Sequence, residues 1–243
     1  MNPQTRERDP VARKSLAGEV ADGLLDRIVA GELPPGSVVP GELELSSRYD
    51  VSRMTVREAI RTLTAQNILR IERGRGTFVN PLERWSSLHA VLRATSEGTD
   101  ASDAAVQLIE LRRMLEAGAC GLAAERISDQ DLAALDALVD QMREARRAQD
   151  LERFVEADLA FHDVILHASG NPFVAVLFEP LSRVLAERRS ETSAVPEIQE
   201  HAIAMHVAVG EALRRRDPEA ARAAMDAHMQ QTLDDLRTYI LNR

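Results

Sequence analysis

The stretch that decides the N-terminal fold is VSRMTVREAIRTLTAQNILRIERGRGTFV, residues 51–79. Ser52 is a favourable N-cap, so we expect a helix over about residues 53–66. One face of this helix is apolar at helical spacing, at Val56, Ile60 and Leu63. The β-prone runs LRIE and TFV follow, separated by RGRG, and they predict a hairpin with a basic, glycine-rich tip.

Two further helices are predicted upstream of this stretch. The first ends near GELPPG, where glycine and paired prolines break its pattern, and its apolar face is formed by Val20, Leu24, Leu25 and Ile28. The second follows Pro40 and runs to about Tyr49. Helix, helix, turn, helix and basic hairpin are the elements of a winged helix-turn-helix, whose second motif helix lies in the DNA major groove.

The helix predicted to enter the groove carries a stripe of arginines at successive steps of four: Arg53, Arg57 and Arg61. Arginine bonds guanine bidentately and also pairs with phosphate. A solvated face on an ordinary helix would show the same spacing. The N-cap, the preceding turn and the RGRG tip, whose glycines let the backbone approach DNA closely, together favour DNA binding over that alternative.

Charge is unevenly distributed along the 243 residues. The net charge is −9, yet residues 1–80 carry 12 Lys/Arg against 11 Asp/Glu, whereas residues 81–243 carry 18 against 28. Within residues 51–76, six arginines stand against two acidic residues. A basic patch on an acidic protein is compatible with phosphate binding, and the acidic part limits nonspecific adhesion.

The composition predicts a soluble, cytoplasmic protein. Apolar residues make up 44% of the chain and aromatic residues 3%, which indicates a helical core built largely from alanine and leucine. No apolar run approaches the roughly 18 residues of a membrane span, and the polar N-terminus lacks the apolar segment of a secretory signal. Cys120 is the only cysteine, so an intrachain disulfide is excluded, a reducing compartment fits, and we interpret this residue as small and buried.

From about residue 84 onward the pattern is helical throughout. Capping residues are recognisable at Ser128 with Asp131, at Asp150, and at Asp217 before Pro218. The expected helices cover about 102–126, 129–148, 151–169, 173–190, 197–215 and 218 onward. The predicted fold class is therefore mostly α, with a winged helix-turn-helix in residues 1–80 and an all-α bundle of six or seven helices in residues 81–243.

Histidines suggest a site within this bundle. In ADLAFHDVILHASGN, residues 157–171, Asp158 and His162 are one helical turn apart and face the same way. They could be a solvated pair, a buried hydrogen bond or half of a metal site. His206 and His228 also lie in apolar helical settings, where a lone histidine is usually a packed core residue. The spacing alone does not decide among these alternatives, although metal sites do form between facing helices of bundles.

The sequence resembles the GntR family of bacterial transcription regulators, in its FadR-like branch with an FCD effector domain. Residues 31–80 resemble the DNA-binding domain almost end to end. ELRRMLEAGACGLAAER (110–126), DLAFHDVILHASGN (158–171) and the 206–228 segment resemble the FCD domain. The resemblance implies a metabolite-responsive regulator that binds palindromic operator DNA as a homodimer and has no enzymatic activity.

The resemblance also implies a metal site and an effector pocket. The family's metal ligands fall on Asp158, His162, His206 and His228, whereas His167 and His201 fall outside the pattern. Zinc fits these ligands, and nickel and manganese fit by ligand type as well. Met205 replaces a glutamate that usually precedes the third ligand. Arg112 and Asn171 match effector-pocket residues, and a small carboxylate is the expected effector.

On the DNA side, the matched positions comprise the N-terminal turns of the groove helix and the wing: Ser52, Arg53, Thr55, Arg57, Arg73, Gly74 and Gly76. One departure is visible. Relatives commonly read PSERELA where this chain reads PGELELS, so Leu43 replaces an arginine that often touches DNA. One contact is therefore expected to be missing.

Two alternatives stay open at this level. The first is a metal-dependent enzyme, but the chain contains no HExxH, GxSxG or P-loop motif, and such an enzyme would leave the arginine-striped module unexplained. The second is a regulator whose bundle binds an acyl ligand without metal. The four matched ligand positions argue against it.

Overall fold

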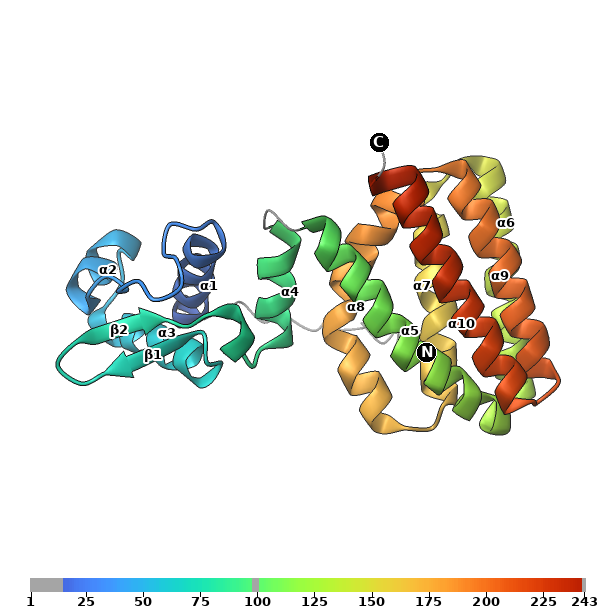
Figure 1. Cartoon of the computed structure of the whole chain (residues 1–243), viewed down its shortest axis with the longest axis horizontal. Coiled ribbons are helices and arrows are strands. Elements are labelled where there is room, and N and C mark those ends of the chain that lie inside the picture. Colours follow the sequence, from blue (N-terminus) through green and yellow to red (C-terminus); the bar gives the residue numbers. More distant parts are fainter. Residues whose placement is uncertain (1–14, 98–100, 242–243) are drawn as a thin grey trace, which may run out of the picture. The chain divides into compact units, whose positions relative to one another are not determined.

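The computed structural model describes residues 15–97 and 101–241. The chain folds as two units that divide between residues 98 and 99 (Figure 1). Each unit has its own hydrophobic core.

The first unit is a winged helix-turn-helix. In chain order it contains α1 (Leu16–Val29), α2 (Glu42–Tyr49), α3 (Arg53–Ala65), β1 (Leu69–Glu72) and β2 (Gly76–Val79). The two strands pair antiparallel, from Leu69 opposite Val79 to Glu72 opposite Gly76. The apolar residues predicted for the faces of α1 and α3 are all buried, which confirms both helices.

Local sequence explains how α3 begins. Asp50 ends α2 in the left-handed conformation, with φ of 51°, and so permits a tight turn. Ser52 then accepts a hydrogen bond from the Thr55 backbone N–H at 3.1 Å, which confirms the predicted N-cap. At the wing, Gly74 and Gly76 have φ of 73° and 122°, conformations that favour glycine.

The unit continues beyond the predicted boundary at residue 80. A short 3₁₀ turn, η1 (Leu82–Arg84), leads into α4 (Leu88–Glu97). Ala90 of α4 is buried in the same apolar cluster as the core of α1 and α3. The sequence pattern grouped this helix with the bundle because helical periodicity does not report which core a helix joins.

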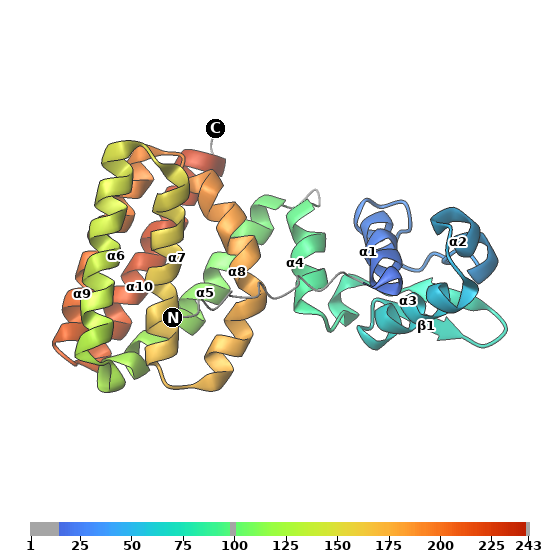
Figure 2. The same ribbon diagram turned by 180° about the vertical axis from the view of Figure 1, so that it is seen from behind.

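The second unit is an all-α bundle, as predicted. Its described residues form six α-helices: α5 (Ala101–Arg126), α6 (Asp129–Ala148), α7 (Leu151–Ala168), α8 (Pro172–Thr192), α9 (Pro196–Arg214) and α10 (Pro218–Asp235). A π-helical segment, η2 (Leu236–Leu241), follows α10. Helices α6 and α9 pack together, α5 packs on α10, and α8 packs on α7 (Figures 1 and 2).

The predicted caps of the bundle are present. Ser128 and Asp131 form a reciprocal capping box at α6, and the side chains of Asp150 and Asp217 accept backbone hydrogen bonds at the starts of α7 and α10. The core combines alanines and methionines with two fully buried aromatic residues, Phe154 and Phe161. Within residues 15–97 and 101–241, no helix has both the length and the apolar character needed to cross a bilayer.

Cys120 is buried, as predicted. Burial and the nearby Glu116 carboxylate raise the pKa of the Cys120 thiol to about 12. The thiol is therefore protonated near neutral pH and has the character of a small core residue.

Candidate metal centre and nucleic-acid interface

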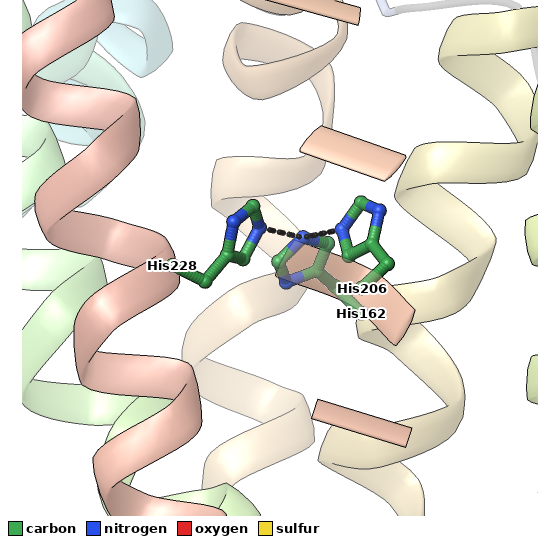
Figure 3. A group of neighbouring side chains, drawn as sticks. All are labelled: His162, His206 and His228. Atoms are coloured by element: carbon green, nitrogen blue, oxygen red, sulfur yellow. Dashed lines mark hydrogen bonds between the residues drawn. The ribbon is translucent and has the colours of Figure 1, made fainter. Parts of the chain in front are cut away.

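Three buried histidines from three helices converge inside the bundle. His162 lies on α7, His206 on α9 and His228 on α10. Figure 3 shows their rings turned toward one another. The Nε2 atom of His162 lies 3.2 Å from Nε2 of His206 and 3.3 Å from Nε2 of His228. The topology therefore brings together side chains that are far apart in the sequence.

These separations fit a tetrahedral cation. Zinc binds imidazole nitrogen at about 2.0–2.1 Å, so two nitrogens on a tetrahedral ion are about 3.3 Å apart. Two short contacts converge on the single Nε2 of His162, which can donate no more than one proton. An ion would satisfy the facing lone pairs better than hydrogen bonding does.

Glu116 of α5 orients the first of these rings. Its Oε2 pairs with His162 Nδ1, and both side chains are buried. Burial alone would raise the pKa of Glu116, but the charges of Arg112 and Arg189 and the hydrogen bond from His162 hold that pKa well below its ordinary value. An ionised carboxylate only accepts hydrogen bonds, so Nδ1 of His162 is the protonated nitrogen and its Nε2 lone pair faces the cluster.

Asp158 lies at the edge of the cluster. It is 5% exposed, and its Oδ1 atom is 3.4 Å from His206 Nε2, while its Oδ2 atom pairs with Arg189 of α8. Among the described residues, the group whose ligand atoms all lie within 4.8 Å of one another consists of the three histidines. The assignment of Asp158 as a fourth ligand stays a prediction.

The second and third histidines are held neutral. Burial, reinforced by the neighbouring imidazoles and by Arg189 and Arg112, lowers the pKa of His206 and of His228 well below 6.5. Neither Nδ1 atom has a hydrogen-bond partner among the described residues. Neutral imidazole is the form that binds a metal ion, so the environment favours the ligand state.

Acidification is expected to destabilise the metal-stripped protein. The unfolded chain takes up protons at these imidazoles near a pKa of 6.5, whereas the folded values for His206 and His228 are depressed. The free energy of unfolding therefore rises with pH, and this contribution is lost as the pH falls from about 6.5 toward the folded pKa. Melting temperatures of the metal-stripped protein between about pH 7.5 and about pH 5.5 measure this loss of stability. The doubly substituted His206→Ala/His228→Ala protein should show a smaller pH dependence, and an equal one would contradict this explanation.

Two buried arginines lie beside the cluster. Arg112 donates from Nε to Glu116 Oε1 at 2.6 Å, and its Nη2 atom has no hydrogen-bond partner among the described residues. With Arg189, Asp158 and His228 it lines a cavity of about 40 Å³. An unpartnered guanidinium nitrogen next to a candidate metal centre is suited to an anionic oxygen. The predicted effector role of Arg112 is compatible with this position.

The remaining residues singled out in the bundle lie elsewhere. Asn171 is the N-cap of α8 and accepts a hydrogen bond from the Phe173 backbone N–H at 3.1 Å. It does not line the small cavity, and its effector role stays a prediction. His167 is exposed, and His201 pairs with Asp235 at 2.9 Å.

Sequence reasoning missed Glu116 and Arg189. A signal for Glu116 was present, because Arg112 and Glu116 are four residues apart in ELRRMLEAG and so share a helix face. On a helix surface that spacing indicates an ordinary ion pair. Only the packing of α5 on α7 and α10 turns this pair into buried support for a histidine.

Glu116→Gln is expected to weaken metal binding by about 10–100-fold, the usual cost of losing an outer carboxylate that orients a ligating imidazole. Competition with a zinc chelator measures the change. Glu110→Gln on the same helix, at an exposed position, is the matched control. Equal zinc affinity in the Glu116→Gln protein and the unmodified protein would rule out this role.

The predicted DNA-reading residues cluster at the start of α3. The guanidinium of Arg57 is held by two hydrogen bonds to Glu42 of α2, at 3.0 and 2.7 Å, and Arg53 contacts the same carboxylate at 3.4 Å. This pairing raises the pKa of Arg57. Ser52 and Thr55 share a hydrogen bond at 2.9 Å. The arginines are exposed and already ordered at the end of the helix that should meet base edges.

The wing and α2 complete this surface. Arg73 and Gly74 lie between β1 and β2, and Gly76 begins β2. Leu43 of α2, which stands where relatives often have arginine, is 73% exposed and next to Glu42 in the chain. It offers an apolar side chain where a cation was expected. The DNA roles of these residues stay predictions.

Comparison with known proteins agrees with this architecture. The model "Bacterial regulatory proteins, gntR family" matches residues 16–79, and the FCD domain model matches residues 107–231. The galactonate operon transcriptional repressor of Escherichia coli is 32% identical over 82% of this chain and 86% of its own length. The transcriptional repressor NanR of Cronobacter sakazakii is 28% identical over 91% and 85%.

Solved structures show the same fold. A GntR protein of Streptococcus agalactiae matches with a TM-score of 0.51 and 29% identity, over 90% of this chain and 99% of its own. Lar, which controls expression of the Listeria monocytogenes agr system, matches with a TM-score of 0.61 and 25% identity, over 93% and 98%. These relatives are transcription regulators and not enzymes. The chain belongs to the GntR family of bacterial transcription regulators and carries an FCD domain behind its winged helix-turn-helix.

Proposed function

We propose that this regulator binds palindromic operator DNA as a homodimer and releases or holds it in response to a small carboxylate sensed at a metal ion in the bundle. The winged helix-turn-helix within residues 1–80 reads the DNA, and the helical bundle within residues 81–243, which begins after α4, senses the effector and dimerises, in the cytoplasm. The observation that carries the proposal is the buried convergence of His162, His206 and His228 beside an unpartnered nitrogen of Arg112.

The charges around the cluster favour an anion. The carboxylates of Glu116 and Asp158 offset the guanidiniums of Arg112 and Arg189. Three neutral imidazoles leave the charge of a divalent ion in place. The ion supplies a Lewis-acidic position with room for an oxygen ligand. A carboxylate would neutralise the remaining charge and accept hydrogen bonds from the arginines.

Zinc is the proposed ion, with nickel or manganese as alternatives of suitable ligand type. A bound acid can change DNA binding only if the acid has a different affinity for the conformation that binds DNA and for the conformation that does not. Couplings of about 1–3 kcal/mol, or roughly 5–150-fold in affinity, are usual for such effects. The galactonate operon repressor, whose name refers to a sugar acid, supports the choice of a carboxylate.

The small DNA interface of a single winged helix supports a homodimer. A single winged helix offers a small interface, whereas a two-fold dimer reads two half-sites about one helical turn apart. Titration of a labelled full operator and of a single half-site distinguishes the two states. Equal affinity for both DNA molecules, with a monomer in sedimentation, would contradict the dimer.

The sensing function is tested by thermal shift with a panel of small acids, on zinc-loaded and zinc-stripped protein. We expect one class of acid to raise the melting temperature only when zinc is present, and the same acid to change operator affinity. Stabilisation that is equal with and without zinc would favour an acyl-type ligand without metal. Turnover of a bound acid would favour an enzyme.

A further inference from the structure

A second, larger cavity adjoins the candidate metal centre and has apolar walls. It measures about 280 Å³ and lies among α5, α8 and η2. Its apolar lining includes Ala105, Leu108, Ile109, Leu185, Leu236 and Ile240. Ile109 and Leu236 belong to an apolar cluster that is separate from the main core of the bundle. The lining is thus mostly apolar, with Ser102, Thr192 and Thr232 as its uncharged polar members.

Three charged residues line the cavity: the buried Arg112 and Arg189, which connect it to the site, and Glu191, which is exposed. Arg112 and Arg189 line both this cavity and the 40 Å³ cavity that contains Asp158 and His228. Arg112 is 3% exposed, and its Nη2 atom has no hydrogen-bond partner in the described part of the chain. Along α5 the lining runs from Arg112 through Ile109, Leu108 and Ala105 to the exposed Ser102, so the buried positive charge lies at one end of an apolar stretch.

We infer that the effector is an amphipathic acid, whose carboxylate lies between Arg112 and Arg189 and whose unbranched hydrocarbon chain occupies the apolar cavity. This inference rests on the proposed function and narrows the class of effector. A polyhydroxylated sugar acid is disfavoured, because each hydroxyl would lose its hydrogen bonds to water against leucine and isoleucine side chains.

A neighbouring groove is less suited to an acid. It measures about 550 Å³ and also borders His162 and Arg189, but its lining includes the exposed residues Asp163 and His167. Each space has an exposed acidic residue in its lining, Asp163 in the groove and Glu191 in the cavity, so the buried arginines and not the acidic residues distinguish the two. The cavity among α5, α8 and η2 is lined by both Arg112 and Arg189, whereas the groove borders only Arg189 of the two, so the cavity is the better match for a carboxylate.

The test is isothermal titration of the zinc-loaded full chain with butanoate, hexanoate, octanoate and gluconate. Affinity is expected to rise about fourfold for each added methylene until the cavity is full, since each buried methylene contributes about 0.8 kcal/mol. Hexanoate is expected to bind more tightly than gluconate, which has the same number of carbons. The acids that bind should also change operator affinity in the same order.

Substitutions in the cavity wall test whether the hydrocarbon part of the acid occupies this cavity. Leu108 is half-buried and lies outside the main core cluster, so Leu108→Asn should flatten the dependence on chain length while leaving the fold intact. Leu82→Asn, at a half-buried leucine of η1 that belongs to neither main core cluster, is the control and should keep the dependence. Ala105→Leu partly fills the cavity and should shift the optimum to a shorter acid. Leu108→Ala replaces the asparagine variant if that protein does not fold.

The outcomes separate this inference from the proposed function. Gluconate binding at least as tightly as hexanoate, or an unchanged chain-length dependence in both Leu108 variants, would overturn the inference and leave the carboxylate-sensing function standing. Failure of all four acids to bind the zinc-loaded protein would overturn the inference, whereas the proposed function is contradicted only if the wider panel of small acids also fails. Binding that rises with chain length, flattens in the Leu108 variants and shortens in Ala105→Leu would support both.

Discussion

Replacing His162 and His228 together with alanine is expected to abolish stoichiometric metal binding and the response of operator binding to acids. The two residues supply Nε2 atoms 3.3 Å apart from two different helices, and both are buried. Loss of an outer residue that orients a ligand already costs about 10–100-fold in metal affinity, and loss of two ligands should cost more. Elemental analysis of the purified protein and operator titration with acid measure the two effects.

The matched control is the pair His167→Ala and His201→Ala, which removes two histidines from the same bundle. His167 is exposed, and His201, which pairs with Asp235, lies outside the group of three histidines. This protein should keep its metal and its response. Retention of metal and of acid response in the His162→Ala/His228→Ala protein would show that the histidine cluster is a packing feature of the core.

Arg57→Ala is expected to weaken operator binding by about 1–3 kcal/mol per half-site, or roughly 5–150-fold. The guanidinium is exposed at the start of α3 and held in a bidentate pair with Glu42, so it is already ordered for planar recognition of guanine or phosphate. Arg53→Ala should have an effect of similar size. Gel-shift or anisotropy titrations at one fixed salt concentration measure the change, because salt alone alters affinity strongly.

Arg143→Ala provides the comparison for this loss. Arg143 is about as exposed as Arg57, at 48% against 50% of the side chain, and it pairs with Asp140 in the bundle. Removing it changes the net charge equally and should leave operator affinity nearly unchanged. Equal affinities for the Arg57→Ala, Arg143→Ala and unmodified proteins would exclude α3 as the reading helix.

Much of the fold could be predicted because local signals decide where helices begin and end. The side chains of Ser52, Ser128, Asp150 and Asp217 all cap the helices expected for them. Apolar spacing likewise identified the buried faces of α1 and α3. The place of α4 could not be predicted, since its pattern is satisfied by either core and only tertiary packing buries Ala90 in the first unit.

The candidate site, too, could be predicted only in part from the sequence. Resemblance indicated the three histidines, and the structure brings them together. Glu116 and Arg189 could not be identified, because their importance depends on which helices become neighbours. A glutamate on one helix and an arginine on another are ordinary surface residues in a sequence this rich in charge. Their burial beside the histidines is a property of the packed bundle.

X-ray absorption at the zinc edge of the loaded protein tests the central claim most directly, because it reports the atoms bound to the ion. We expect three imidazole nitrogens at about 2.0–2.1 Å with the remaining ligands oxygen, and a change in the oxygen shell when an effector acid is added. The imidazole signal should disappear in the His162→Ala/His228→Ala protein. A spectrum without imidazole scattering, or one unchanged by those substitutions, would contradict a metal ion held by this cluster.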